Sequence, residues 1–288
     1  MRMRVRWLLP IALVPLVLAV TAVAVSAQGG RGGGAPVAPA GPVPHLPDGR
    51  PDLIGNFSGS RGDFSNTVIL EAHAGGFGVT AGPTLILDPP EGMIPYQPWA
   101  LAERDRRRED TNGYEDPVGH CEFYDIGRIH SFAMDFAYVG TDYLIINANQ
   151  HITRVVDMKR REHLPGGIRL WIGDPIGRWE GDTLVVDSTN FNGRTRMSIG
   201  GDFYSADAHV VERFTMLDSN TIKWTMTVTD PKVFTRPWTM TSQVPMTRQR
   251  NPGVAAFDGE DTCHEGNVDL AHLKNSYEQT HGNASWVR

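Results

Sequence analysis

The sequence contains only two cysteines in 288 residues, and it contains no long run of basic residues. Its 27 lysines and arginines are outnumbered by 33 aspartates and glutamates. Because phosphate contacts by Lys and Arg dominate the affinity of proteins for nucleic acids, this balance excludes nucleic acid as an expected partner. Phosphate-binding loops, dinucleotide-binding fingerprints, HExxH zinc motifs and nucleophile elbows are also missing. We therefore expect no organic cofactor and no metal ion.

The N-terminus has the three parts of an export signal. Residues 1–6 carry three arginines and no acid, residues 8–25 are almost wholly apolar, and small residues end the segment at Ala27. A permanent membrane anchor is the alternative, since the apolar run approaches the ~20 residues that span a bilayer. Pro10 and Pro15 interrupt that run. We predict cleavage after Ala27, which gives a periplasmic or secreted protein without a stable membrane span.

The chain after the signal divides into two parts by composition. Residues 28–50 are mostly Gly, Pro and Ala, and such a stretch buries too little surface to offset its ordering entropy, so we expect a flexible spacer. Residues 51–288 are expected to form a single β-rich domain. Residues 1–27 hold three of the basic residues and none of the acidic ones, so the remaining chain has a net charge of −9.

Alternating apolar and polar residues predict strands, because successive side chains of a strand point to opposite faces. The clearest cases are residues 209–216, 222–228 and 238–246, and a hairpin is expected around Gly140. Residues 98–108 predict a short helix with a charged, solvated face, and residues 267–280 predict a C-terminal helix. The pattern indicates an all-β, mainly antiparallel fold, either a lipocalin-like barrel or a two-sheet sandwich.

One stretch, GRWEGDTLVVDSTNFN at residues 177–192, resembles a large family of uncharacterised exported bacterial proteins. Other similar pieces are DPPEGMIPY (88–96), HVVERFTM (209–216), TVTDPKVFTRPWT (227–239) and CHEGN (263–267). The chain departs from the family pattern at MKRREHLP (158–165), where a DGRxHP-like segment is usual, and at Val268, where an aromatic residue is usual. The resemblance implies membership of the family and assigns no catalytic residue.

The two cysteines suggest the first candidate site. An even number of cysteines in an exported protein predicts a disulfide, here between Cys121 and Cys263. That bond would bring together the side chains that flank each cysteine: His120, Glu122, His264 and Glu265. Histidine titrates near neutrality and glutamate can be tuned by burial, so these four are our candidate catalytic residues for acid–base chemistry. Neighbouring side chains on a strand point apart, so not all four can converge.

The tryptophan motif suggests a second site, which would bind a ligand. Trp179 could stack on an aromatic or sugar ring, and Glu180 lies beside it in a group of carboxylates with Asp182 and Asp187. The alternative is a hairpin whose acids satisfy turn backbone groups while Trp179 packs in the core. Further candidate ligand-binding residues are His151, Arg154 and His163, which lie on or near predicted strands.

Three functions remain open from the sequence. The first is an exported β-barrel-like protein that engages a small apolar, aromatic or sugar-like molecule. The second is a cofactor-free lyase, isomerase or hydrolase that uses His and Glu as acid and base. The third is an interaction domain of a cell-envelope complex, which would need an exposed apolar patch.

Overall fold

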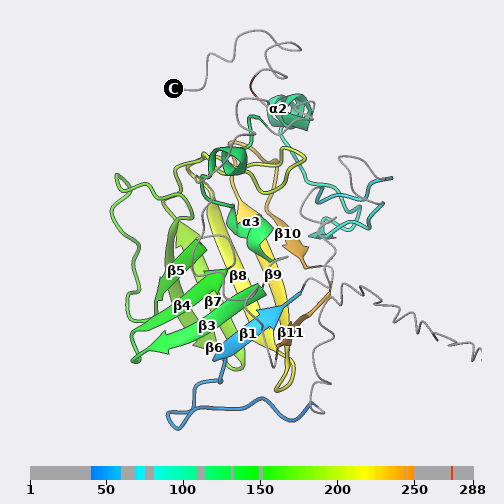
Figure 1. Cartoon of the computed structure of the whole chain (residues 1–288). Coiled ribbons are helices and arrows are strands. Elements are labelled where there is room, and N and C mark those ends of the chain that lie inside the picture. Colours follow the sequence, from blue (N-terminus) through cyan, green and yellow to red (C-terminus); the bar gives the residue numbers. More distant parts are fainter. Residues whose placement is uncertain are drawn as a thin grey trace, which may run out of the picture. The chain divides into compact units, whose positions relative to one another are not determined.

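Strands make up most of the regular structure in the computed structural model of this chain (Figure 1). The structure describes residues 40–59, 69–74, 81–108, 114–130, 133–148, 152–242, 244–249 and 274. All of them belong to one unit, Gly34–Arg288. The predicted all-β class is confirmed. The predicted export signal lies outside the described residues. Of the predicted C-terminal helix, only Lys274 is described, and it has helical conformation.

Short strands and a few helical segments follow one another along the chain. The strands are β1 (Gly55–Ser58), β2 (Ile86–Asp88), β3 (Ala133–Val139), β4 (Tyr143–Ala148), β5 (Ile152–Asp157), β6 (Asp174–Glu180), β7 (Thr183–Thr189), β8 (His209–Met216), β9 (Thr221–Thr229), β10 (Trp238–Thr241) and β11 (Met246–Arg248). The helical segments are α2 (Pro98–Arg108), the 3-10 turn η1 (Pro117–His120) and α3 (Ile126–Ile129).

The sheet closes on itself. Neighbouring strands run in the order β1, β3, β4, β5, β6, β7, β8, β9, and β11 joins the two ends by pairing with both β9 and β1. Among the described residues, nine strands therefore form a closed barrel, which is the first of the two predicted architectures. β10 and β2 extend from the other half of the β9 edge. The predicted strand 238–246 is in fact two strands, β10 and β11, that take separate partners.

The barrel interior is filled by side chains that alternate along each strand. On β8 the buried positions are Val210, Glu212, Phe214 and Met216, and on β9 they include Trp224. Phe214 pairs with Trp224 across the two strands, and Phe136 of β3 packs edge-on against Phe214. At roughly 25 cal/mol per Å² of apolar surface, each large ring buried here stabilises the fold by about 2–3 kcal/mol. This packing leaves the ends and the outer wall of the barrel to carry accessible chemistry.

One pair of neighbouring strands is parallel. β6 meets β5 through a single pairing, Asp157 with Ile176, and then continues beyond the end of β5. Parallel neighbours cannot be joined by a tight hairpin. The chain makes a long excursion over residues 158–173 before it re-enters the sheet at Asp174. This excursion carries Arg160 and His163 against the outer face of the barrel.

The structure contains two of the predicted hairpin turns and one of the predicted helices. Gly140 and Gly181, with φ of 61° and 58°, occupy the predicted hairpin turns before β4 and before β7. The helix predicted over residues 98–108 is α2. The expectation of a wholly solvated charged face is wrong for Arg104, which is 4% exposed because Glu71 and Asp202 bind its guanidinium. The short helix α3 was not predicted.

Part of the predicted spacer touches the barrel. The backbone N–H of Gly41 donates to Ser219 Oγ at 2.9 Å, and His45 Nε2 lies 2.9 Å from Asp182 Oδ1. Both partners lie in turns between strands. Across the stretches whose structure is described, no helix combines the length and the apolar character that crossing a bilayer requires.

Candidate functional site

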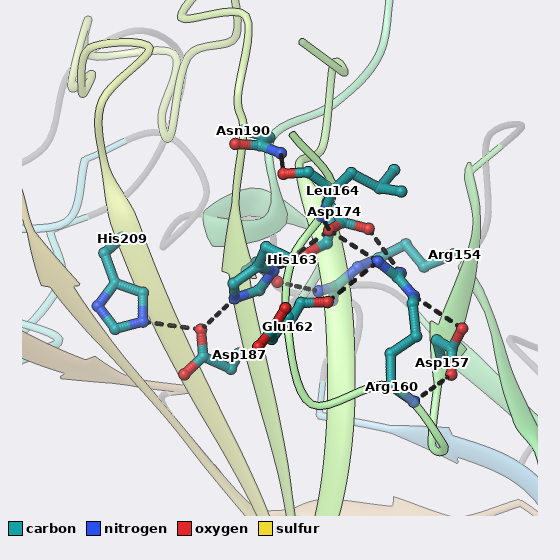
Figure 2. Close-up of polar contacts among 11 residues, drawn as sticks. Arg154, Asp157, Arg160, Glu162, His163, Leu164, Asp174, Asp187, Asn190 and His209 are labelled. Atoms are coloured by element: carbon teal, nitrogen blue, oxygen red, sulfur yellow. Dashed lines mark hydrogen bonds and ion pairs between the residues drawn. The ribbon is translucent and has the colours of Figure 1, made fainter. Parts of the chain in front are cut away.

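Two histidines share one carboxylate on the outer face of the barrel (Figure 2). Asp187 of β7 points outward, because its neighbours on the strand, Val186 and Ser188, are turned into the core. Its Oδ1 lies 3.0 Å from His163 Nε2 and 2.8 Å from His209 Nε2. We call these three residues the histidine–aspartate cluster. The structure thus joins His163 and Asp187, which the sequence suggested for separate reasons, to His209, which it did not select.

His163 is held from both sides. Its Nδ1 lies 3.1 Å from the backbone oxygen and 3.2 Å from Oδ2 of Asp174, so both ring nitrogens are occupied by acceptors. Arg160 binds the same Asp174 carboxylate at 2.7 Å and also binds Asp157 at 2.8 Å. Burial raises the pKa of Asp174, but the hydrogen bonds from Arg160 and from the Leu164 N–H outweigh it and lower the pKa. His163 therefore fastens the 158–173 excursion to the barrel.

His209 differs from His163 because only one of its ring nitrogens has a hydrogen-bond partner among the described residues. Its side chain is 44% exposed, and Nδ1 has no hydrogen-bond partner in the part of the chain that the structure describes. The hydrogen bond to Asp187 raises the pKa of His209 and outweighs the effect of burial. Burial raises the pKa of Asp187, but the hydrogen bonds and charges of the two histidines lower it overall. An ionised Asp187 only accepts, so neutral His209 carries its proton on Nε2 and leaves Nδ1 free as a base.

The barrel interior contains a buried ion pair. Arg154 of β5 and Glu212 of β8 are both fully buried, and Arg154 NH2 donates to Glu212 Oε2 at 2.5 Å. The other Glu212 oxygen accepts from Trp224 Nε1 at 3.2 Å. Arg154 Nε and NH1 have no partner among the described residues. Arg154 therefore points inward, but it lies in a packed core rather than on an accessible wall.

An open cleft lies between α2 and the loop that joins β7 to β8. Its volume is about 690 Å³, and one wall is a single face of α2, made by Trp99, Ala102, Glu103, Arg106 and Arg107. These positions follow the spacing of one helix face. The opposite wall consists of Asn192, Gly193 and the segment 203–206. The loop that supplies this wall joins Thr189, the last residue of β7, to His209, the first residue of β8, so it connects the two strands that carry Asp187 and His209.

Trp99 is the most exposed ring of the cleft. Its side chain is 56% exposed, yet its indole N–H donates to the Lys232 carbonyl at 3.1 Å, and its ring meets Phe203 edge-on with centroids 6.1 Å apart. The ring is therefore held in place while more than half of Trp99 stays exposed beside the cleft. An oriented, exposed indole is a suitable surface for stacking a planar ring.

The two arginines of the cleft differ in how many of their guanidinium nitrogens donate hydrogen bonds. Arg106 places all three guanidinium nitrogens on Glu103 and Glu115 at 2.8–2.9 Å. Arg107 donates only Nε, to Glu103 at 2.8 Å, and its guanidinium lies 4.0 Å from the centroid of the Phe203 ring. The hydrogen bonds from Arg106, followed by that from Arg107, lower the pKa of Glu103 to about 2. Glu103 is therefore ionised and orients both arginines.

The cysteine-based site falls partly outside the described residues. Cys263, His264 and Glu265 lie there, as does His151, so the disulfide and their roles stay predictions. His120 Nε2 contacts the Tyr114 carbonyl at 2.6 Å. Glu122 accepts from Arg194 at 3.2 Å. Cys121, between them, adopts the left-handed conformation with φ of 60° at the end of η1.

Of the residues selected in the tryptophan motif, Asp187 belongs to the histidine–aspartate cluster, whereas Trp179 and Glu180 do not. Trp179 is half-buried and packs against the core, and Glu180 is exposed and pairs with Arg178 and Arg213 at 2.8 Å. Both lie at the far end of β6 from Asp174, which at ~3.3 Å per residue is about 17–20 Å away. This placement fits the alternative in which the motif builds a hairpin, and their ligand-binding role stays a prediction.

Comparisons with known proteins give no further assignment. No protein-family model matches the sequence, and neither curated proteins nor solved structures gave a match. Among the described residues, no group of three or more His, Cys, Asp and Glu side chains is arranged to hold a metal ion. Trp99, Arg107 and His209 were not selected from the sequence. The face spacing of α2 was visible there, but the loop that faces it was not.

Proposed function

We propose that this protein is exported and binds a small molecule with a flat face, an aromatic or sugar ring, in the cleft beside α2. The observation that carries the proposal is the open indole of Trp99 at the wall of this cleft. The volume of about 690 Å³ falls within the roughly 300–1,000 Å³ typical of ligand sites. The packed barrel interior supports a site at the end of the barrel rather than inside it.

Trp99→Ala is expected to weaken retention of the ligand at least about tenfold, since a stacked ring contributes roughly 1.5–3 kcal/mol. The purified protein would be incubated with glycans, phenolics and lipids, and mass spectrometry would identify what it retains. The matched control is Trp171→Ala, which removes another tryptophan, one that stacks on Phe123 outside the cleft lining. Equal retention by the parent and both variants, or loss in the control alone, would refute a site at Trp99.

A second candidate function is a cofactor-free acid–base enzyme, and the free Nδ1 of His209 favours it. Asp187 orients the ring and raises its pKa, so His209 serves as base only above that raised pKa. His209→Asn is therefore expected to abolish turnover of a library compound while leaving its retention in the cleft unchanged. In Asp187→Asn, NMR titration is expected to give a lower His209 pKa than in the parent. Equal product formation by parent and His209→Asn would exclude this role.

A further inference from the structure

The charges that line the cleft are unequal. Of its three charged residues, Arg106 and Arg107 are cationic and Glu103 is anionic. Glu103 is shared by both arginines, and Arg106 is additionally neutralised by Glu115. Arg107 therefore carries the positive charge that is least compensated within the cleft.

Arg107 also has hydrogen-bonding capacity left over. Its side chain is 23% exposed, and its two terminal nitrogens have no hydrogen-bond partner within the described ranges. The two N–H groups at the end of a guanidinium form a fork that matches the two oxygens of a carboxylate. Stacking on Phe203 and the bond to Glu103 hold this fork in place. A ligand carboxylate would thus meet a preoriented donor pair.

The distance between Trp99 and Arg107 limits the size of the ligand. Phe203 lies between them, 6.1 Å from the Trp99 ring centroid and 4.0 Å from the Arg107 guanidinium carbon. The indole and the guanidinium are therefore at most about 10 Å apart. A carboxylate attached directly to a ring has a shorter reach than one on a side chain of two or three carbons. The bound of about 10 Å leaves room for a ring with an acidic side chain of two or three carbons.

Resting on the proposed binding function, we propose that the cleft takes an arylalkanoic or arylpropenoic acid, with its ring on Trp99 and its carboxylate on the terminal nitrogens of Arg107. Phe203 lines the cleft and contacts both anchors, so the linker that joins ring to carboxylate would pack against it. Discrimination between the acid and its neutral amide then comes from Arg107, while the ring contact is common to both.

The probes are cinnamate and cinnamamide, which have the same shape and differ in charge. Calorimetric titration of the purified protein is expected to give at least about tenfold tighter binding of cinnamate, the ratio that a charge-assisted hydrogen-bonded pair supplies. Arg107→Gln is expected to make the affinities for cinnamate and cinnamamide equal without weakening the binding of cinnamamide. Arg107→Lys is expected to keep part of the preference for cinnamate. The control Arg178→Gln changes an exposed arginine on β6 and should leave the ratio intact.

The salt dependence of the parent gives an independent test if Arg107→Gln does not fold. Raising the ionic strength is expected to weaken cinnamate and to leave cinnamamide unchanged. Equal affinities for acid and amide, both reduced by Trp99→Ala, would overturn the carboxylate assignment and leave the proposed function standing. Failure of cinnamate to bind at all would also overturn it. Retention of no library compound at Trp99 would contradict the proposed function itself.

Discussion

Replacing Glu212 with leucine is expected to lower the free energy of unfolding by about 3–5 kcal/mol. The substitution leaves the Arg154 guanidinium buried in the barrel without its counter-ion, and it leaves the Trp224 indole N–H without its acceptor. Burying an unpaired charge is far costlier than burying an apolar side chain of similar volume. Urea denaturation followed by tryptophan fluorescence measures the effect.

The double variant Arg154→Met/Glu212→Leu is the control for this prediction. Removing both charges eliminates the uncompensated ion, so the double variant is expected to be more stable than Glu212→Leu alone. The exposed Glu180, replaced by leucine, should change stability little, because it is paired at the surface. A Glu212→Leu protein as stable as the parent would show that the interior pair is not buried as described.

The protein is expected to lose about 3 kcal/mol of stability between pH 7 and pH 4 through His130 alone. Burial lowers the pKa of His130 to about 4, against an opposing contribution from the Gly127 carbonyl that accepts from Nδ1. Its ring stacks on Trp224 with centroids 4.8 Å apart. Since the ordinary histidine pKa is near 6.5, the unfolded chain binds this proton first, and stability falls as the pH drops below that value.

The measurement compares the parent with His130→Gln in urea titrations at several pH values. Glutamine donates to the same Gly127 carbonyl and does not titrate, so the difference in stability between the two proteins is expected to change with pH. The parent should lose more stability below pH 6.5 than the variant does. Parallel curves from pH 7 to pH 4 would mean that His130 is not buried in its neutral form.

Much of the barrel was predictable because its strands carry local signals. The alternation in β8 and β9 and the turn residues Gly140 and Gly181 mark strands and hairpins without knowledge of their partners. The closure through β11 was not predictable. It depends on the connection between Thr241 and Met246, where the chain leaves its pairing with one half of β9 and returns to the other half, and the alternating sequence pattern continues through that break.

The candidate sites were predictable only in part, because they are formed by residues distant in sequence. His163 and Asp187 were selected for separate candidate sites, but they meet each other and His209 through the register of β6, β7 and β8, which a single sequence does not reveal. Likewise, the sequence shows Trp99 and Arg107 only as residues of one face of a charged helix. Their place in a cleft depends on the 203–206 segment, which forms the opposite wall. Trp179 was selected as a ring that could stack on a ligand; it is half-buried in a hairpin strand, and its ligand-binding role stays a prediction.

The most direct test of the binding site uses the indole N–H signals of the tryptophans. The Trp99 signal would be assigned by its loss in Trp99→Phe, and the pooled phenolics and glycans retained by the protein would then be added. We predict that the Trp99 signal shifts while that of Trp224, buried in the barrel, stays in place. A retained ligand that shifts only the signals of other tryptophans, or none, would contradict a binding site beside α2.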